Sequence, residues 1–340
     1  MEQEPAPPRV IQIQPEKSRT ALWVLIAVSI GFLLPVCACA VLLATAVTSL
    51  GILGTDSPSS SSSGTGDAVA IVRVEGAIFS SDDVDDFTTG ANSAVVMADL
   101  RSAMDDPTVK AILLRVDSPG GSVTGSAQIY ELVREIEKPL IVSMAAVAAS
   151  GGYYISAPAD YIIARPDTVT GSIGVIMTLF NADDFLNEWG IDIINITSGP
   201  NKAIGSAWED LTPEQRGILE AFIDEAYEDF VQIIVDGRNL DEATVRQLAD
   251  GRIYSGRQAQ ANGLVDELGN LDNAIAKAAE LGGISGEPRI VEYEHLPSFE
   301  SFLTGFSTRL NHSQADQVLE AIDAFTLPAI EYRYVGPASE

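Results

Sequence analysis

The chain has 340 residues, of which 46% are hydrophobic, and it carries 20 Lys and Arg against 48 Asp and Glu. This composition excludes a disordered or fibrous chain, and the length suits one large domain or two small ones. Nucleic acid is not an expected partner, because a formal net charge of −28 repels a phosphate backbone.

An uncharged segment runs from Arg19 to Asp56. Within it, residues 21–53 exceed the roughly 20 residues that cross a bilayer, so we predict a transmembrane helix there. A cleaved signal peptide is the alternative, but its apolar core has only about 7 to 15 residues. The positive-inside rule, applied to Lys17 and Arg19, predicts that residues 1–20 are cytoplasmic and that the rest of the chain lies outside the cell membrane.

A Ser/Gly-rich segment at residues 54–67 is the predicted flexible linker. Residues 68–295 then alternate β-rich and amphipathic runs, which predicts an α/β domain with a parallel sheet, followed by a tail at 296–340. The expected strands cover residues 69–74, 111–116, 140–144, 161–164 and 191–196. The expected helices cover residues 93–104, 126–137, 185–189, 213–235, a short stretch after Ser255, and 273–281.

Few residue types are available for catalysis. The two cysteines, Cys37 and Cys39, lie in the apolar run, which excludes a zinc cluster, a cysteine-protease site and a disulfide framework. The two histidines, His295 and His312, come late in the chain. Catalysis by a serine would therefore need a base other than histidine.

Ser150 follows the strand expected at 140–144 and lies among Ala and Gly residues. A serine on a sharp turn from strand to helix can act as an exposed nucleophile, and the next N–H can contribute to an oxyanion hole. The alternative is that Ser150 only caps an Ala-rich helix. A second turn, Pro119-Gly120-Gly121, presents bare backbone N–H groups, although such turns are usually structural.

Lys202 is one of only five lysines and lies in a loop with Gly, Pro and Ala. A lysine acts as a general base only as the neutral amine, which requires burial. The alternative is an ordinary solvated lysine at the surface.

Five motifs occur in order between about residue 69 and residue 279: VDSPGGSV, SMAAVAASGGYYISAPAD, TVTGSIGVI, TSGPNKAIGS and GRIYSGRQAQANGLVDELG. They resemble the signal peptide peptidase A family, peptidase family S49, in its short single-copy form. The family belongs to the Clp/crotonase superfamily, so the resemblance implies repeated β-β-α units with a parallel sheet, here preceded by one transmembrane helix.

The resemblance also implies roles for five residues. Ser150 matches the nucleophile and Lys202 the general base of a Ser-Lys dyad. Ser172 matches a serine that orients the lysine, and Gly121 matches the glycine of the oxyanion hole. The N–H of Gly151 is the expected second donor of that hole.

The implied activity is that of a membrane-anchored serine endopeptidase that degrades signal peptides left in the membrane after export, without a metal or cofactor. Tandem members of the family share each active site between two copies, whereas this chain has room for one copy. The resemblance therefore implies a homo-oligomer in which Ser150 of one chain faces Lys202 of its neighbour.

Four other functions are alternatives to this one. A Clp-type mechanism needs a histidine soon after the serine, and the stretch RPDTVTGSIG contains none. A crotonase normally lacks this serine and lysine. A related Ser-Lys protease that acts on stomatin-like or other membrane proteins stays an alternative, as does a non-catalytic membrane scaffold.

Overall fold

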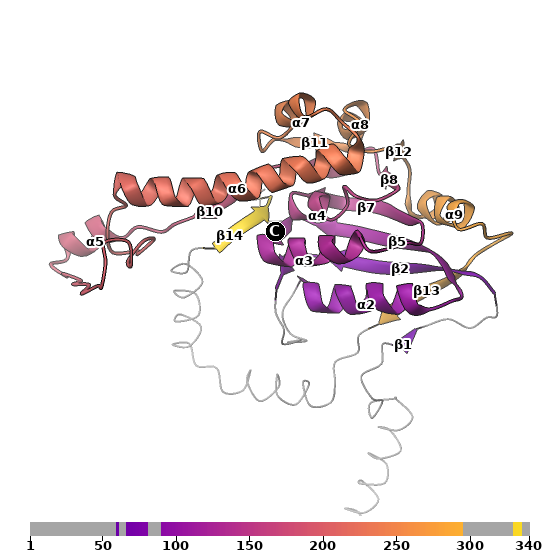
Figure 1. The fold of residues 1–340 in the computed structure, drawn as a ribbon, viewed down its shortest axis with the longest axis horizontal. Helices are drawn as coiled ribbons and strands as arrows, with labels where there is room; N and C mark the ends of the chain where they lie inside the picture. Colours follow the sequence, from indigo (N-terminus) through magenta and orange to yellow (C-terminus); the bar gives the residue numbers. More distant parts are fainter. Residues whose placement is uncertain (1–58, 61–65, 81–89, 295–328, 335–340) are drawn as a thin grey trace, which may run out of the picture. The chain divides into compact units, whose positions relative to one another are not determined.

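The computed structural model describes residues 59–60, 66–80, 90–294 and 329–334. Among these residues, nine strands form a large sheet (Figure 1). Its main path has the order β1 (Ser59–Ser60), β13 (Arg289–Glu294), β2 (Ala68–Glu75), β5 (Val109–Ser118), β7 (Leu140–Ala149), β8 (Tyr161–Ala164) and β12 (Glu267–Leu268). Two further strands, β9 (Val169–Gly171) and β11 (Ile253–Ser255), extend from β7. Neighbours from β13 to β12 are parallel, which confirms the predicted α/β class with a parallel sheet.

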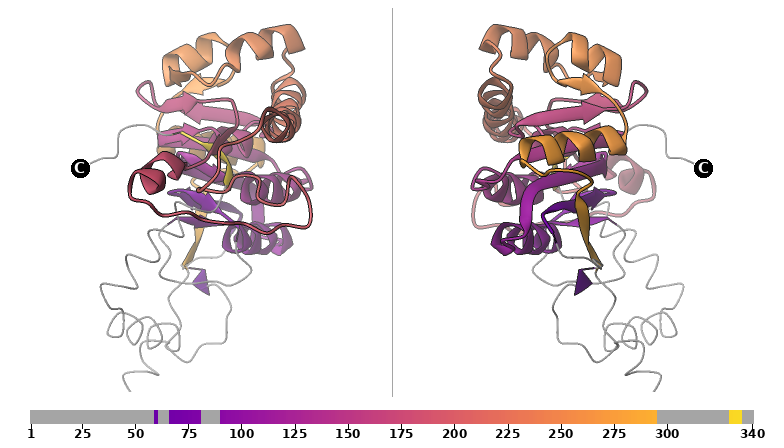
Figure 2. Two further views of the ribbon diagram at one scale, coloured as in Figure 1. Left: turned by 90° about the vertical axis from the view of Figure 1, so that its left-hand side faces the viewer. Right: turned by 90° about the vertical axis from the view of Figure 1, so that its right-hand side faces the viewer.

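Side chains alternate between the two faces of this sheet, as the period of two along a strand requires. On β2, Ala70 and Val72 belong to one buried cluster and Val69 and Ile71 to another. Helices α2 (Ser93–Asp105) and α3 (Val123–Val133) cover the first face, and α9 (Leu271–Leu281) covers the second (Figure 2). Both faces are buried, which explains the continuous apolar runs in the strands.

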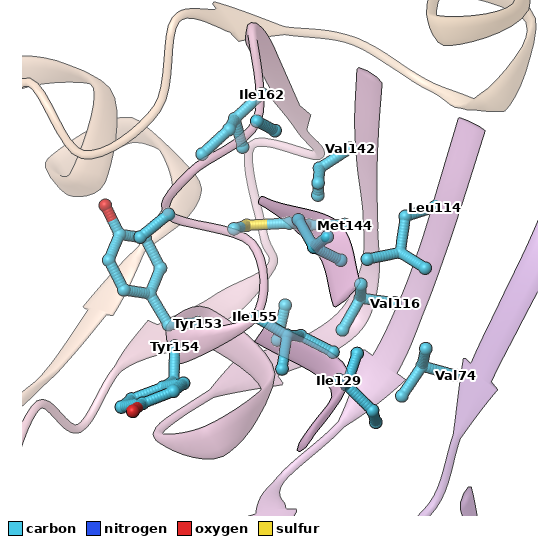
Figure 3. Close-up of a cluster of buried hydrophobic side chains, with 14 of the residues drawn as sticks. Val74, Leu114, Val116, Ile129, Val142, Met144, Tyr153, Tyr154, Ile155 and Ile162 are labelled. Carbon is cyan, nitrogen blue, oxygen red and sulfur yellow. The ribbon is translucent and has the colours of Figure 1, made fainter. Parts of the chain in front are cut away.

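The first cluster surrounds the short helix α4 (Gly151–Tyr154), which begins directly after β7. Figure 3 shows Val142 and Met144 of β7 on the same side of the sheet as Leu114 and Val116 of β5, with Ile155 beside them. The start of α4 is therefore held by close packing on the central strands.

The remaining helices are α5 (Asp183–Glu188), α6 (Pro213–Arg238), α7 (Glu242–Leu248) and α8 (Gly256–Ala261). Thr212 and Gln215 form a capping box at the start of α6, and Ser255 and Gln258 form one at the start of α8. Each box satisfies backbone N–H groups that have no partner within the helix. The helices predicted at 213–235 and after Ser255 are confirmed at these signals.

Most of the other predicted elements are also found. Strands contain the predicted residues 69–74, 111–116, 140–144 and 161–164. Helices cover the predicted 93–104 and 273–281, whereas α3 starts three residues before 126 and ends at 133, and α5 covers 183–188. Helix α7 was not predicted.

The strand predicted at residues 191–196 is wrong. Residues 191–197 have no regular secondary structure, and their side chains are exposed. The sequence IDIINI has the apolar, β-branched composition of a strand, but no described strand pairs with it. Composition alone could not reveal the missing partner strand.

These isoleucines belong to an arm, which we define as residues 179–226. It comprises α5, the loop after it and the first half of α6, which extends beyond the sheet (Figure 1). Nine of the twelve large hydrophobic side chains found exposed among the described residues lie on the arm. Large exposed apolar patches are more typical of interaction sites than of ordinary protein surface.

A second, smaller sheet has the order β10 (Ile176–Thr178), β14 (Ala329–Arg333), β6 (Gly120–Ser122), β3 (Ile78–Phe79) and β4 (Ala91–Asn92). Strand β14 comes from beyond residue 295, where the predicted domain ends. It pairs in antiparallel fashion with β10 on one side and with β6 on the other.

No helix within the described ranges is long and apolar enough to cross a membrane. The predicted tail at 1–20, the predicted transmembrane helix at 21–53, and His295 and His312 lie outside the described residues.

An ion pair between the buried Arg238 side chain and the Asp266 side chain, which is 29% exposed, provides a test of the packing between α6 and the loop before β12. Arg238 is 6% exposed and donates to Asp266 at 2.5 Å, and Asp266 also accepts the N–H of Ile162 at 2.7 Å. Substituting Asp266→Ala removes the charged partner of the Arg238 guanidinium, so we expect the free energy of unfolding to fall by about 1.5 to 3 kcal/mol in urea titrations. The control Asp167→Ala removes a pair with Arg165 that is exposed on both sides, and it should leave stability nearly unchanged. Equal losses in the two variants would contradict this assignment.

Candidate active site

Two predicted site residues, Ser150 and Ser172, meet at one edge of the large sheet together with Gly120, which was not among the predicted site residues. Ser150 follows the end of β7, Gly120 follows the end of β5, and Ser172 follows the end of β9. Both β5 and β9 pair with β7 in parallel. Parallel neighbouring strands end at the same edge of the sheet, so the strand order brings these residues close together. This is the edge at which α/β folds bind ligands.

Ser150 forms a sharp turn between β7 and α4. Its φ of 52° and ψ of −117° lie in a region that costs non-glycine residues about 1 to 3 kcal/mol. Three backbone hydrogen bonds hold the turn: the Ser150 N–H donates to the Gly171 carbonyl at 2.8 Å, and the Ser150 carbonyl accepts from Tyr153 and Tyr154, each at 2.8 Å. The strained backbone is thus fixed from both sides.

The Ser150 hydroxyl does not cap the helix that follows it. No side-chain capping hydrogen bond is present at the start of α4. Ser150 is 1% exposed, and its Oγ is buried without a hydrogen-bond partner. An unsatisfied buried hydroxyl costs about 1 to 3 kcal/mol, so this arrangement does not serve stability. It argues against the interpretation of Ser150 as a structural cap.

Gly120 brings the glycine turn into contact with the serine turn. It has a φ of +89°, and a Cβ at this position would lie 2.5 Å from the Gly151 nitrogen and 2.1 Å from the Tyr332 carbonyl oxygen. Only glycine permits this approach. Two side chains hold the turn: the Ser118 hydroxyl accepts the Gly120 N–H at 3.1 Å, and the Asp117 carboxylate accepts the Val147 N–H at 3.0 Å.

Gly121 and Gly151, the two predicted oxyanion-hole residues, both lie in this crowded backbone. Gly121 pairs with Ile78 of β3 and with Tyr332 of β14. A Cβ on Gly151 would lie 2.5 Å from the Ser126 hydroxyl and 3.1 Å from the Gly120 Cα. Gly151 therefore lies directly against Gly120, and Gly121 is the next residue of the same glycine turn.

Ser172 lies next to Ser150 through the strand pairing of β7 and β9. The carbonyl that accepts the Ser150 N–H belongs to Gly171, the residue before Ser172. Ser172 has a φ of 49°, is 9% exposed, and donates its N–H to the Arg252 carbonyl at 2.8 Å. The Thr170 hydroxyl donates to the Ala148 carbonyl at 2.6 Å and fixes β9 on β7.

Lys202 is not part of this cluster within a single chain. It lies in the arm, between α5 and α6, and Figure 1 shows this loop at the end of α6 that is far from α4. The side chain is exposed, so the burial that a lysine base needs is not provided by its own loop.

Among the described lysines, Lys202 also differs in its partners. The ammonium groups of Lys110 and Lys138 donate to backbone carbonyls, and Lys277 pairs with Glu280. The Lys202 ammonium has no hydrogen-bond or ion-pair partner among the described residues. In a chain with a net charge of −28, an unpaired lysine is unusual and available for another role.

Three features of the site were missed from the sequence. Gly120, rather than Gly121, makes the closest approach to Gly151, and Ser126 has a buried hydroxyl without a partner. Strand β14 was also missed, although Ile330, Tyr332 and Tyr334 alternate with charged residues in the manner of a strand. Over the described part of the chain, no group of three or more His, Cys, Asp or Glu is placed to hold a metal ion.

Comparison with known proteins identifies relatives of this arrangement. The model of peptidase family S49 matches residues 133–285, and the Clp protease model matches residues 64–168. The two matches together include Gly120, Ser150 and Lys202.

Three relatives indicate how much of a whole protein the chain represents. A Synechocystis sp. protein, provisionally named a protease, is 38% identical over 66% of this chain and 78% of its own length. Protease 4 of Salmonella typhi is 39% identical over 64% of this chain and 35% of its own length. An Enterococcus faecium protein, provisionally named signal peptide peptidase SppA, is 37% identical over 58% of each chain. The chain thus spans about a third of Protease 4 and just over half of the Enterococcus protein.

Because the backbone of Gly120 packs against the backbone of Gly151, a methyl group added at Gly120 should destabilise the protein. Gly120→Ala should lower the free energy of unfolding by about 2 kcal/mol or more, because a positive φ alone costs an L-residue about 1 to 2 kcal/mol and the Cβ also meets two backbone atoms. The control is Gly217→Ala in α6, where a Cβ meets nothing within 4 Å, and it should raise stability by about 0.5 to 1 kcal/mol. Chemical denaturation measures both values. A Gly120→Ala protein as stable as the parent would show that the close approach does not exist.

Proposed function

The chain belongs to peptidase family S49, and from this membership we propose that it is a membrane-anchored serine endopeptidase. One observation carries the proposal. The Ser150 Oγ is held without a hydrogen-bond partner on a strained turn, beside glycine backbone, at the carboxyl ends of parallel strands. A structural serine has no need of this arrangement, whereas a nucleophile requires it.

The proposed reaction proceeds through an acyl-enzyme. The Ser150 Oγ attacks the peptide carbonyl while the neutral amine of Lys202 takes the hydroxyl proton, and the lysine then gives that proton to the leaving amine. Water releases the acyl group in a second step that uses the same base. The N–H groups of Gly121 and Gly151 stabilise the oxyanion, an effect worth about 3 to 4 kcal/mol per donor in other enzymes, and Ser172 orients the lysine.

Lys202 reaches Ser150 from a second copy of the chain in this proposal. Two observations support an assembled site: the Lys202 ammonium has no partner among the described residues, and the arm that carries it has an exposed apolar surface. Burying the arm against a neighbouring chain would remove apolar side chains such as Trp189 and Ile194 from water. It would also supply the burial that favours a neutral lysine.

The proposed substrates are signal peptides that remain in the membrane after export. The name of the Enterococcus relative supports this class, as does the uncharged run at residues 21–53, which would hold the domain near the bilayer. Lys17 and Arg19 favour an extracytoplasmic domain. Other membrane proteins, including stomatin-like ones, are the alternative substrates, and a non-catalytic scaffold is the alternative function.

The nucleophile is tested by Ser150→Ala in the full chain. We expect kcat/KM for an apolar fluorogenic peptide to fall by about 10⁴-fold or more. Because the lost oxygen has no partner, thermal stability should not decrease. Ser102→Ala on α2 is the matched control and should retain the activity of the parent. Substantial turnover by the Ser150→Ala protein would exclude the serine-protease mechanism.

Sharing of the site is tested by mixing two inactive proteins, Ser150→Ala and Lys202→Ala, under conditions of subunit exchange. If each site takes its serine and its lysine from different chains of a closed ring, about a quarter of the sites regain both residues in an equal, random mixture. Peptidase activity of the mixture against each protein alone measures this recovery. Demonstrated exchange without recovered activity would show that both residues come from one chain.

A further inference from the structure

Ser126 of α3 has a buried hydroxyl that its own helix does not use. The residue is 0% exposed, and its Oγ has no hydrogen-bond partner among the described residues. A serine of this kind commonly donates to the carbonyl four residues earlier, as Ser156 does to Gly152 at 2.6 Å. The equivalent acceptor for Ser126 is the Ser122 carbonyl, to which its Oγ does not donate. The Ser126 side chain therefore serves something other than its helix.

The Ser126 Oγ lies against Gly151, the residue after the proposed nucleophile. A Cβ built on Gly151 would lie 2.5 Å from this oxygen, whereas the Gly120 Cα and the Tyr332 carbonyl oxygen would both lie 3.1 Å away. Gly151 is helical, so its backbone conformation does not itself demand glycine. The Ser126 hydroxyl thus occupies the place that a side chain at position 151 would take.

Helix α3, which runs beside α4, holds Ser126 in this position (Figure 1). Gly125 packs so closely on β3 that a Cβ there would lie 3.0 Å from the Phe79 carbonyl carbon. Ile129 of the same helix is 0% exposed in the first core cluster. The helix therefore cannot move away from Gly151 without breaking its contacts with β3 and with the core.

The direction of the Gly151 N–H matters because this group is a proposed donor to the oxyanion. Gly151 is the first residue of α4, so its N–H has no acceptor within its own helix and is available to a ligand. Glycine has the widest choice of backbone conformations of any residue. An oxyanion donor is effective only when it is held in place before the charge develops. Some neighbouring group therefore has to restrain the peptide between Ser150 and Gly151.

Protein stability gives no reason for a hydroxyl at position 126. A buried hydroxyl without a partner is destabilising, and an alanine of nearly the same shape would not carry this penalty. In the part of the chain that the structure describes, only Ser126 and Ser150 have such hydroxyls, and both adjoin Gly151. Two unsatisfied hydroxyls beside one residue of the proposed oxyanion hole indicate a requirement of the reaction.

We propose that Ser126 is a positioning residue for the oxyanion hole: its Oγ fills the space beside the Gly151 Cα and thereby fixes the direction of the Gly151 N–H. This inference rests on the proposed peptidase function, and Ser126 acts through Gly151 rather than on the substrate. Because the effect depends on an atom in a particular place, a methyl group supplied from position 151 should replace the oxygen supplied from position 126.

The first test is Ser126→Ala in the full chain. Loss of the Oγ frees the Gly151 peptide, so kcat for a fluorogenic peptide should fall about 10- to 100-fold while KM changes by less than about twofold. Because the lost hydroxyl has no partner, thermal stability should stay the same or rise. The matched control is Ser143→Ala. Ser143 is 1% exposed and accepts a hydrogen bond from Arg115 at 2.7 Å, so this variant should lose stability and keep its kcat.

The second test moves the filling atom from one residue to the other. Gly151→Ala alone places its Cβ 2.5 Å from the Ser126 Oγ, so it should lower both thermal stability and kcat. Adding Ser126→Ala removes that oxygen and leaves the new methyl group in the vacated space, where the remaining contacts at 3.1 Å require only small adjustments. We expect the double variant to be at least tenfold more active than Gly151→Ala alone, which a double-mutant cycle reports as coupling between the two positions.

Inhibitor binding shows whether the loss arises at the oxyanion. In the adduct with a peptide aldehyde, the Ser150 Oγ bonds to the aldehyde carbon, the hydroxyl proton passes to Lys202, and the former carbonyl oxygen carries the negative charge. The corresponding peptide alcohol forms no such bond and develops no charge. Ser126→Ala should weaken inhibition by the aldehyde by the same factor as kcat and leave inhibition by the alcohol unchanged.

The outcomes separate this inference from the peptidase assignment. Equal kcat in the parent and Ser126→Ala proteins, or equal loss of affinity for the aldehyde and the alcohol, would overturn the positioning role. A double variant no more active than Gly151→Ala would contradict the filling of one shared space. These results leave the peptidase function intact, because they require a parent that cleaves the peptide. A parent that cleaves no peptide overturns the proposed function instead, and the thermal stabilities of the three variants then decide whether Ser126 and Gly151 are in contact.

Discussion

The close approach of backbone at Gly120 to backbone at Gly151 fixes the geometry of the site. It brings the end of β5 against the start of α4, and the packing of Tyr154 and Ile155 in the core then holds α4 in place. The Ser150 turn lies between this contact and the hydrogen bond to Gly171. Neither flank can move without breaking buried backbone interactions, so the strained conformation of Ser150 is imposed by its surroundings.

Much of this arrangement could be predicted from local sequence. The four central strands have the apolar runs of a sheet buried on both faces, and the capping boxes at Thr212 and Ser255 mark the starts of α6 and α8. The turns at Gly120 and Ser150 follow strand ends, and parallel strands end together. The local sequence pattern was therefore sufficient to predict those strands, helices and turns whose own residues carry the apolar run, the capping residues or the glycines.

Prediction failed where a long-range partner decides the structure. Residues 191–196 have the composition of a strand but no described partner strand. Residues 329–333, in contrast, pair with β6 and β10, which lie far earlier in the sequence. Gly120 rather than Gly121 contacts Gly151. Which of the two glycines does so depends on how the turn bends, and the sequence Pro-Gly-Gly does not specify that bend. Pairing and close approach are properties of the assembled chain.

The two residues of the proposed dyad are held by different parts of the fold. Ser150, Ser172 and the glycine turn are fixed by the central sheet, whereas Lys202 lies on an arm attached to the domain through α6 and the segment after β10. A rigid nucleophile with a separately mounted base permits a site that is complete only after assembly.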